Sequence, residues 1–374
     1  MTDDLDEQEL PNTEEEVSDD DEVLANIVQP FDPSEIRVSS KQLSLDSILA
    51  RIENSEIVLQ PEFQRQEVWK EDARSRLIES ILIRIPLPAF YVDATDEDKW
   101  LVVDGQQRLS TLRRFVIEES LHLKGLEFLK DFDGATFSKL PRQFQRRIRE
   151  TNVTVYLIEK GTPSAVKINI FKRINTGGLP LSPQEIRHAL NGAPATLLLK
   201  RLAESEPFLK ATRRSIPQAR MADREYITRF FAFSLTKPSE YASQEFDSFL
   251  NETMKMMNAM NESERGEFVQ KFTTSMTTAS ELLGKHAFRK VYGQDERLRP
   301  INKALFEAWS VNLAVLDRTQ IKRLVVHKVL LLEKFIDLMQ DRAFEQSITQ
   351  GTGDVAKVRL RFREIERIIR ETLK

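Results

Sequence analysis

The chain has 374 residues, of which 40% are apolar and 30% charged, as in an ordinary soluble globular protein with room for about two domains. It contains no cysteine, so disulfides, thiolate metal sites and cysteine nucleophiles are excluded, and nothing argues for secretion. The formal net charge of −4 is unevenly spread: residues 1–36 hold fourteen of the 59 acidic side chains and no Lys or Arg, which leaves 45 acidic against 55 basic side chains in the remainder.

The acidic first segment, residues 1–36, is expected to be a disordered, solubilising tail. The alternative is that it competes with phosphate groups for the positive remainder of the chain. Its start lacks the basic residues and apolar run of a signal peptide. The most apolar later stretch, LVVHKVLLLEKFIDLM, is interrupted by charged side chains, so it is predicted to form an amphipathic helix. We therefore expect a cytoplasmic protein without a membrane span.

The elements that follow are typical of a mixed α/β domain. SSKQLSLDSILARIENSEIVLQ predicts a short amphipathic helix and then a short strand, and apolar residues repeat at helical spacing from Ala73 to Ile85, where Pro86 and Pro88 stop the helix. AFYVD and KWLVVD bracket ATDED and predict a hairpin. A helix is expected from about Gly105, and NVTVYLIE alternates like another strand.

Helices are expected to dominate the rest of the chain. Thr162 and Pro163 suit the N-cap and first turn of a helix through Ile174, which TGG ends. The next helix opens with a capping box from Ser182 to Glu185, and beyond it there is almost no strand pattern.

We thus predict an α+β chain of three parts. An acidic disordered tail over residues 1–36 precedes a mixed α/β domain over 37–195 and an all-helical domain over 196–374. There is no internal repeat and no long Gly/Ser/Pro linker, so we expect the two folded parts to pack together.

LVVDGQQRLSTLRRF, residues 101–115, runs from a strand into a helix through a turn of polar groups. One interpretation is structural, with Asp104 as the N-cap and Gln107 as its capping-box partner. This leaves Gln106, Arg108 and Gly105 unexplained, although Gly105 would allow a ligand to approach the backbone. Because a helix N-terminus offers free N–H groups and partial positive charge, the turn is also suited to bind phosphate. The turn alone does not decide between the two.

Two further loops carry polar groups that could join such a site. PEFQRQEVWK places Arg65 in an irregular segment after a strand, with Phe63 and Trp69 as apolar anchors. FKRINTGGLPLSPQE places Asn175 beside two glycines at a helix end. Taken by itself, the first loop is better explained by a solvated arginine beside a packed Phe and Trp, and a glycine C-cap followed by an N-cap explains the second loop well.

The sequence also excludes some chemistry and offers candidate DNA contacts. It has no Walker loop, and no two of its four histidines have metal-ligand spacing, which argues against a ββα-metal nuclease centre. The basic clusters RQFQRRIR, with Arg146 and Arg147, and TRRSIPQAR, with Arg213 and Arg214, could follow a DNA backbone, as could the last helix. A solvated helix face is the alternative for each.

Three motifs in this order, PEFQRQEVW, LVVDGQQRLSTL and FKRINTGGLPLSPQEIRHAL, closely resemble the N-terminal domain of GmrSD-type modification-dependent restriction endonucleases. The resemblance covers about residues 40–200 and implies a ParB- and sulfiredoxin-like fold. It implies a nucleotide site, for binding and hydrolysis coupled to attack on foreign DNA, that is lined by the signature residues Asp104, Gly105, Gln106, Gln107 and Arg108.

The same resemblance implies that Arg65 and Asn175 are neighbours of the nucleotide. Full-length enzymes of this type add an HNH-type nuclease domain, whose histidines this chain does not supply. DNA cleavage by the chain itself is therefore not implied, and a separate nuclease or methyltransferase is a candidate partner.

Our leading hypothesis is a bacterial protein that binds and hydrolyses an NTP with Mg²⁺ and acts on DNA in restriction or phage defence. In it, Arg108 and Arg65 neutralise phosphate charge, and Asp104 holds Mg²⁺ directly or through water. Gln106 or Gln107 orients the attacking water.

Two alternatives remain open. One is a metal-dependent DNA nuclease in which Asp104 and neighbouring carboxylates such as Asp93 bind the metal. The other is a non-enzymatic, DNA-binding regulatory module whose signature turn holds backbone phosphate. The sequence leaves the identity of the nucleotide and self-association into a homo-oligomer open.

Overall fold

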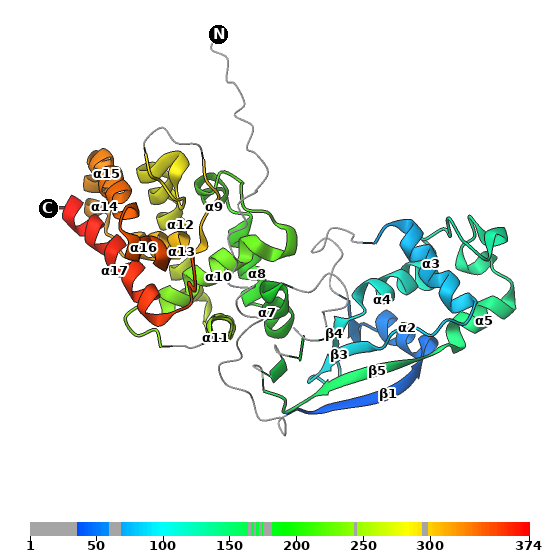
Figure 1. Cartoon of the computed structure of the whole chain (residues 1–374). Helices are drawn as coiled ribbons and strands as arrows, with labels where there is room; N and C mark the ends of the chain where they lie inside the picture. Colours follow the sequence, from blue (N-terminus) through cyan, green and yellow to red (C-terminus); the bar gives the residue numbers. More distant parts are fainter. Residues whose placement is uncertain are drawn as a thin grey trace, which may run out of the picture. The chain divides into compact units, whose positions relative to one another are not determined.

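A computed structural model of the chain describes residues 36–59, 69–163, 166–167, 170–171, 174, 182–242, 245–293 and 298–374 (Figure 1). The chain divides into two compact units, one within Phe31–Leu181 and one that comprises, in the described residues, Ser182–Lys374. We call them the sheet unit and the helical unit. The acidic segment up to residue 35, Arg65 and Asn175 lie outside the described residues.

The sheet unit contains a five-stranded mixed sheet in its described residues. The strands are β1 (Val38–Ser44), β2 (Ile57–Val58), β3 (Phe90–Ala94), β4 (Trp100–Asp104) and β5 (Asn152–Glu159), in the order β1-β5-β3-β4-β2. β5 runs antiparallel to β1 and parallel to β3, whereas β4 runs antiparallel to β3 and parallel to β2. The predicted hairpin, short strand and alternating strand are thus confirmed as β3–β4, β2 and β5.

β1 is a strand that the sequence pattern does not predict. Its residues, VSSKQLS, are mostly polar and mostly exposed, because β1 is an edge strand whose one partner is β5. An edge strand that buries little apolar surface lacks the alternation by which strands are found in a sequence.

Helices cover one face of this sheet (Figure 1). That face carries Phe90, Val92, Val102 and Val155, which share a buried core with apolar residues of the helices. The helices are α2 (Leu45–Glu53), α3 (Glu71–Leu82), α4 (Gln106–Leu112), which a π-helical turn over Arg113–Ile117 prolongs, and α5 (Arg142–Glu150). The predicted helices after residue 44 and around residues 73–85 are thereby confirmed, the latter ending at Leu82.

The other face of the sheet carries Tyr91, Asp93 and Tyr156, because side chains alternate along β3 and β5. The helix expected from residue 163 to 174 contributes to this face through Lys167, whose Nζ lies 2.9 Å from Asp93 Oδ2. The described residues of this stretch, 166, 167, 170, 171 and 174, are helical.

The helical unit confirms the predicted helical remainder: within Ser182–Lys374, the described residues contain helices and one isolated β-bridge, between Arg289 and Ile301. The predicted capping box of Ser182 and Glu185 opens the first helix. The helices are α7 (Pro183–Asn191), α8 (Ala195–Ala203), α9 (Glu206–Ala211), α10 (Ala222–Leu235), α11 (Phe246–Ala259), α12 (Glu262–Leu283), α13 (Lys303–Ala314), α14 (Arg318–Val326), α15 (Lys328–Met339), α16 (Arg342–Ser347) and α17 (Val355–Thr372).

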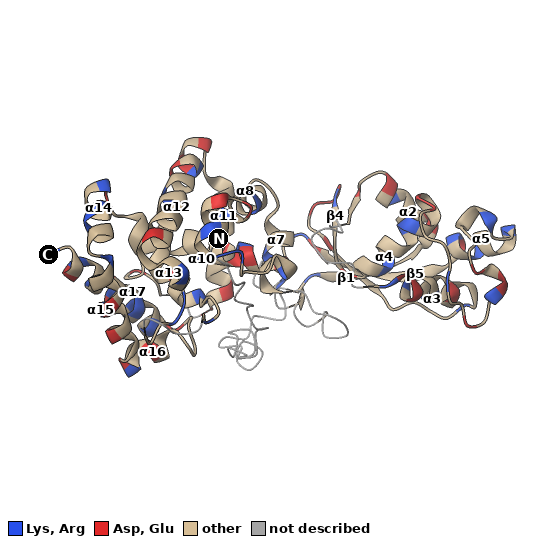
Figure 2. Ribbon diagram, turned by 90° about the horizontal axis from the view of Figure 1, so that it is seen from above, with Lys and Arg blue, Asp and Glu red and all other residues tan. Residues whose placement is uncertain are grey.

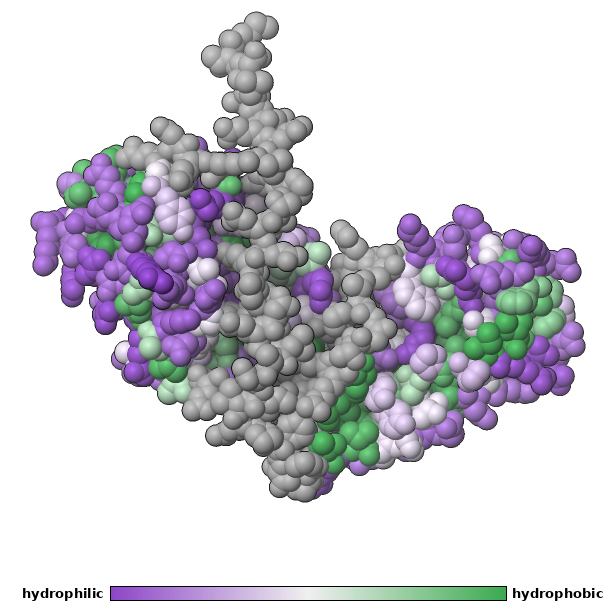
Figure 3. Space-filling view, in the orientation of Figure 1, coloured by the Kyte–Doolittle hydropathy of each residue, from purple (hydrophilic) through white to green (hydrophobic). Residues whose placement is uncertain are grey.

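The stretch LVVHKVLLLEKFIDLM departs from its prediction as one amphipathic helix. His327, with φ −102° and ψ 23°, separates α14 from α15. The break leaves Val326 and Val329 largely exposed, whereas Leu331 and Phe335 are buried. Among the described helices, none has the length and apolar character needed to cross a lipid bilayer. Hydrophilic residues cover most of the visible surface of both units (Figure 3).

Candidate functional site

The signature residues Asp104 to Arg108 connect β4 to α4. Asp104 is the last residue of β4 and lies opposite Tyr91 of β3. Gly105 is the N-cap of α4, in a left-handed conformation with φ +96°, and no side chain caps the helix. The predicted capping box of Asp104 and Gln107 is therefore wrong. Asp104 stays in the strand, and its carboxylate bonds the Arg108 side chain one helical turn later.

Arg108 ties the turn to the chain just before β3. Its Nη2 donates to Asp104 Oδ2 at 2.7 Å and to the Ala89 carbonyl at 3.1 Å, and its Nη1 donates to the Pro88 carbonyl. The guanidinium also lies over the Phe90 ring, 4.5 Å from its centroid. Burial lowers the pKa of Arg108, and the charge of Asp104 opposes that shift. The guanidinium is thus fixed and largely buried, and it holds Asp104 in one position.

Gly105 is required by packing as well as by backbone conformation. A Cβ atom at this position would lie 2.3 Å from Phe90 Cδ1, closer than a side chain can come. The close approach that the sequence suggested for a ligand is, in the structure, an approach to the Phe90 ring. Because Arg108 stacks on the same ring, the Phe90 side chain constrains both the backbone of the turn and the position of the Arg108 guanidinium.

Among the acceptor atoms of the signature, Asp104 Oδ1 and Gln107 Oε1 accept no hydrogen bond from the described residues. Asp104 is about one third exposed, at 34%, and only its Oδ2 is bonded, so Oδ1 is open. Gln107 Oε1 is buried and has no hydrogen-bond partner. Gln106, the first residue of α4, is half-buried beside it. The turn therefore presents a fixed carboxylate next to amide groups.

Arg74 of α3 stabilises α4 after the signature turn, and it was not identified from the sequence. It is 1% exposed; its Nη1 donates to Thr111 Oγ1 at 3.3 Å, and that hydroxyl donates to the Gln107 carbonyl at 2.7 Å. Its Nε donates to the Trp69 carbonyl at 3.3 Å. A signal was present, because Arg74 lies four residues before the buried Ile78 and so on the apolar face of its helix.

A pair of stacked tyrosines adjoins Asp104 on the sheet. Tyr91 faces Asp104 on β4 and Tyr156 on β5, and the two rings lie 4.8 Å apart at an interplanar angle of 18°. Burial and the neighbouring Tyr156 and Asp104 raise the pKa of Tyr91. Sequence reasoning could not find this pair, because the register between strands distant in the chain is not readable from local patterns.

Asp93, considered as a second metal ligand, is engaged elsewhere. Its carboxylate is buried and accepts hydrogen bonds from Lys167 Nζ, at 2.9 and 3.2 Å, and from the Thr95 backbone N–H at 3.0 Å. In the part of the chain that the structure describes, no group of three or more His, Cys, Asp or Glu residues could hold a metal ion. Asp93 is thus bound by Lys167 and Thr95, whereas Asp104 is bound by Arg108.

The basic cluster of α5 has exposed and structural members (Figure 2). Arg146 is exposed. Arg147 donates through Nη1 to the Leu82 carbonyl at the end of α3 and lies 5.0 Å from the Phe144 ring centroid. Arg147 therefore fastens α5 to α3, whereas Arg146 is available at the surface.

The second predicted cluster lies in the helical unit, directly after α9. Arg213 and Arg214 are exposed and both adopt positive φ, at 53° and 55°. Arg214 Nη2 lies 3.3 Å from Glu206 Oε2, in a pair whose two side chains are mostly in solvent. Such a pair is weak, so both arginines remain able to contact a polyanion.

Comparison with known families matches residues 45–191 to the family described as GmrSD restriction endonuclease, N-terminal domain. The match runs from the start of α2 to the end of α7 and includes the whole signature turn. No curated protein and no solved structure matches the chain. The resemblance inferred from the three motifs is confirmed: residues 45–191 of this chain form a domain of the GmrSD restriction endonuclease N-terminal family.

Proposed function

We propose that this protein binds and hydrolyses a nucleoside triphosphate at the signature turn and acts on DNA in restriction or phage defence. The family match supports the coarser part of the proposal, because the family is described as a restriction endonuclease domain and restriction acts on DNA. A nuclease or methyltransferase encoded separately remains the partner that we expect.

The observation that supports the nucleotide site is the arrangement of Asp104. Its Oδ2 is fixed by Arg108 at 2.7 Å and its Oδ1 is open, while Gln107, three residues on, has a buried Oε1 without a partner in the described residues. A carboxylate held in one rotamer can orient a water molecule without reorganising during the reaction. Gln106 and Gln107 supply amide groups that can position the same water.

The residues present fit Mg²⁺ bound together with a nucleotide. Mg²⁺ takes hard oxygen ligands and is commonly held by one or two carboxylates plus substrate phosphates, and Asp104 supplies one such carboxylate. When bound there, the ion would neutralise charge on the phosphates. Arg108 keeps two N–H donors that the described residues do not use, and Arg65 remains a predicted second cation. In this proposal Arg108 chiefly positions Asp104.

Nucleotide turnover by the full chain tests the proposal. ATP, GTP, CTP and UTP are supplied with Mg²⁺, with and without DNA, to the natural protein and to Asp104→Asn. Asparagine keeps the shape and can still accept from Arg108, so we expect a folded variant with turnover reduced by at least about 100-fold. Asp46→Asn is the matched control, because Asp46 is also paired with an arginine, Arg149, but is exposed and distant from the turn.

Arg108→Lys separates positioning from charge. Lysine keeps the positive charge but cannot bond Asp104, Ala89 and Pro88 together, so we expect turnover to fall while nucleotide binding is largely kept. Turnover that Asp104→Asn leaves intact, or no turnover with any of the four nucleotides, would overturn the proposal.

A further inference from the structure

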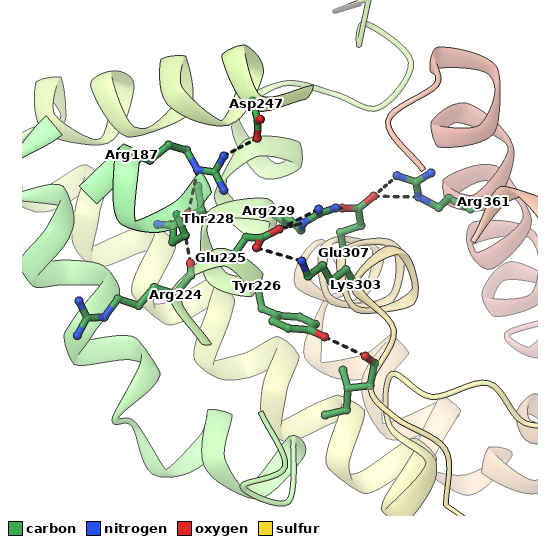
Figure 4. A network of polar contacts seen from close by, with 12 residues as sticks. Arg187, Arg224, Glu225, Tyr226, Thr228, Arg229, Asp247, Lys303, Glu307 and Arg361 are labelled. Atoms are coloured by element: carbon green, nitrogen blue, oxygen red, sulfur yellow. Dashed lines mark hydrogen bonds and ion pairs between the residues drawn. The ribbon is translucent and has the colours of Figure 1, made fainter. Parts of the chain in front are cut away.

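Two basic side chains of the helical unit have buried nitrogen atoms without hydrogen-bond partners. They are Nε and Nη1 of Arg224, in the first turn of α10, and Nδ1 of His188, in the last turn of α7. In Figure 4 the Arg224 side chain points away from the surrounding ion pairs, and its guanidinium makes none of the contacts drawn. His188 lies within the residues that match the family, outside the signature turn.

In the described part of the helical unit, other arginines do have carboxylate partners, in contrast to the Arg224 guanidinium. Arg187 pairs with Asp247 at 2.7 Å, Arg229 with Glu225 at 2.9 Å, and Arg361 is bonded to Glu307. Carboxylates of α10, α11 and α13 thus pair with other arginines, but among the described residues none bonds the guanidinium of Arg224. A buried donor without an acceptor is destabilising, and more so when it is charged, so a protein keeps such a group where something else satisfies it.

The neighbouring carboxylate of Asp223 makes no side-chain bond to the Arg224 guanidinium in the described residues, although the two charges interact. Asp223 Oδ1 accepts the backbone N–H of Arg224 at 2.8 Å, rather than its guanidinium, and burial raises the pKa of Asp223. Burial, and then the charge of Arg224, lower the pKa of His188 to about 4. His188 is therefore neutral at neutral pH, and a neutral imidazole can donate one N–H without adding to the local charge.

We propose that Arg224 and His188 form a phosphate-binding site in the helical unit, separate from the signature turn. The two buried guanidinium N–H groups and the imidazole can each meet a different oxygen of one tetrahedral oxyanion, whereas a carboxylate has only two oxygens to offer. Arg220, four residues before Arg224 and about half exposed at 52%, lies 3.9 Å from Glu185 Oε2. The phosphate belongs either to a free nucleotide or to the DNA backbone.

Inorganic phosphate is the first probe, titrated into the full chain in a buffer without other oxyanions. We expect saturable binding by calorimetry, a shift of the His188 imidazole resonances in NMR spectra, and a rise in the unfolding temperature. His188 is one of four histidines, so its resonances can be assigned with the His188→Leu variant. No saturable binding of phosphate to the natural protein would overturn the proposal.

Arg224→Gln should weaken phosphate binding at least about tenfold and abolish the phosphate-dependent rise in unfolding temperature. Without phosphate, the same variant should unfold at the same or a higher temperature, because it removes an uncompensated buried charge. His188→Leu provides a second variant should Arg224→Gln fail to fold. Arg363→Gln is the matched control, because Arg363 is 69% exposed on α17 and, in the described part of the chain, pairs with its neighbour Glu364. Equal phosphate affinity in Arg224→Gln and Arg363→Gln would refute the site.

Two further binding measurements, one with DNA and one with a mononucleotide, identify the source of the phosphate. If it is DNA, Arg224→Gln should lower affinity for a short duplex and reduce the salt slope by about one ion. If it is a nucleotide, a mononucleotide should bind more tightly than inorganic phosphate, and Arg224→Gln should remove the binding at this site while leaving that at the signature turn. Asp104→Asn should leave phosphate binding at Arg224 unchanged, so failure of this inference and failure of the proposed function can be told apart.

Discussion

At the scale of single residues, the signature turn depends on Gly105. Its φ of +96° disfavours any side chain, and a Cβ atom would lie 2.3 Å from the Phe90 ring. The left-handed conformation costs a non-glycine residue about 1–2 kcal/mol, and overpacking adds about 1–3 kcal/mol. We expect Gly105→Ala to lower the free energy of unfolding by about 2–5 kcal/mol, measured by chemical denaturation.

Gly134→Ala separates the cost of placing alanine at a positive φ from the cost of the close contact with Phe90. Gly134 also has a positive φ, +81°, but nothing lies within 4 Å of its added Cβ. This variant should lose only the conformational part, about 1–2 kcal/mol. If both alanine variants lost the same free energy, the contact of Gly105 with Phe90 would not constrain the turn.

His188 makes the stability of the helical unit depend on pH. Its pKa is about 4 in the folded chain, through burial and the charge of Arg224, against an ordinary value of 6.5. Between these values the unfolded chain binds a proton at His188 more readily than the folded chain does. The contribution of His188 to the free energy of unfolding is therefore complete above about pH 6.5 and is lost as the pH falls toward 4. The full loss amounts to about 3 kcal/mol.

The measurement is denaturant unfolding at pH 7.5 and pH 5 in oxyanion-free buffer, for the natural chain and for His188→Gln. Glutamine does not titrate, so the variant should show a fall in stability between the two pH values that is smaller by about 2 kcal/mol. Parallel falls in both proteins would show that His188 is not the titrating group.

At the scale of elements, Glu307 of α13 connects helices that are distant in the chain (Figure 4). It is fully buried, accepts from Arg361 Nε of α17 at 2.9 Å, and lies 3.3 Å from Arg229 Nη1 of α10. Arg229 in turn pairs with Glu225, which Lys303 of α13 also contacts at 3.1 Å. Burial opposes ionisation of Glu225, but these cations hold its pKa far below the usual range.

Removing the charge of Glu307 leaves two buried arginines without adequate compensation. Glu307→Gln should therefore destabilise the helical unit by about 3–5 kcal/mol, measured by chemical denaturation. The double variant Glu307→Leu/Arg361→Met removes both charges of the closest pair and should recover part of that loss. A double variant no more stable than Glu307→Gln would mean that the network stabilises by more than charge compensation.

Elements that bury a regular apolar face were predictable from the sequence, and those that do not were missed. α2, α3 and β5 have such faces, and each was found within a few residues of its ends. β1 is an edge strand of the sheet and exposes most of its side chains, so its sequence lacks the apolar alternation by which strands are recognised. The break at His327 was missed as well, because both α14 and α15 have helical patterns and only backbone geometry separates them.

The site was predictable in its residues but not in its contacts. The turn, its glycine and its arginine were all identified from the sequence, but the cap considered for Asp104 is wrong and the contacts that hold Arg108 were not predicted. Local patterns do not show that Pro88, Ala89 and Phe90 of the preceding segment bind the arginine. Contacts between segments separated in sequence cannot be derived from local patterns.

At the scale of the whole molecule, charge is divided between the acidic segment and the rest of the chain. Residues 1–36 carry fourteen negative charges, and the remaining residues have 55 basic against 45 acidic side chains. A polyanionic segment competes with DNA for basic groups, so it should weaken DNA binding when salt is low. Arg146, Arg213 and Arg214, all exposed, are among the groups for which it would compete.

Replacing the fourteen acidic residues of the segment by Asn or Gln in the full chain tests this effect of charge. Duplex affinity, measured by fluorescence anisotropy, should rise at least about threefold at about 50 mM salt, and the gain should shrink at about 200 mM as screening shortens the range of the charges. A shuffled segment with its acidic residues retained should bind like the natural chain, because composition and not order sets the charge. Equal affinity of the neutral and natural chains at low salt would mean that the segment does not reach the DNA-binding surface.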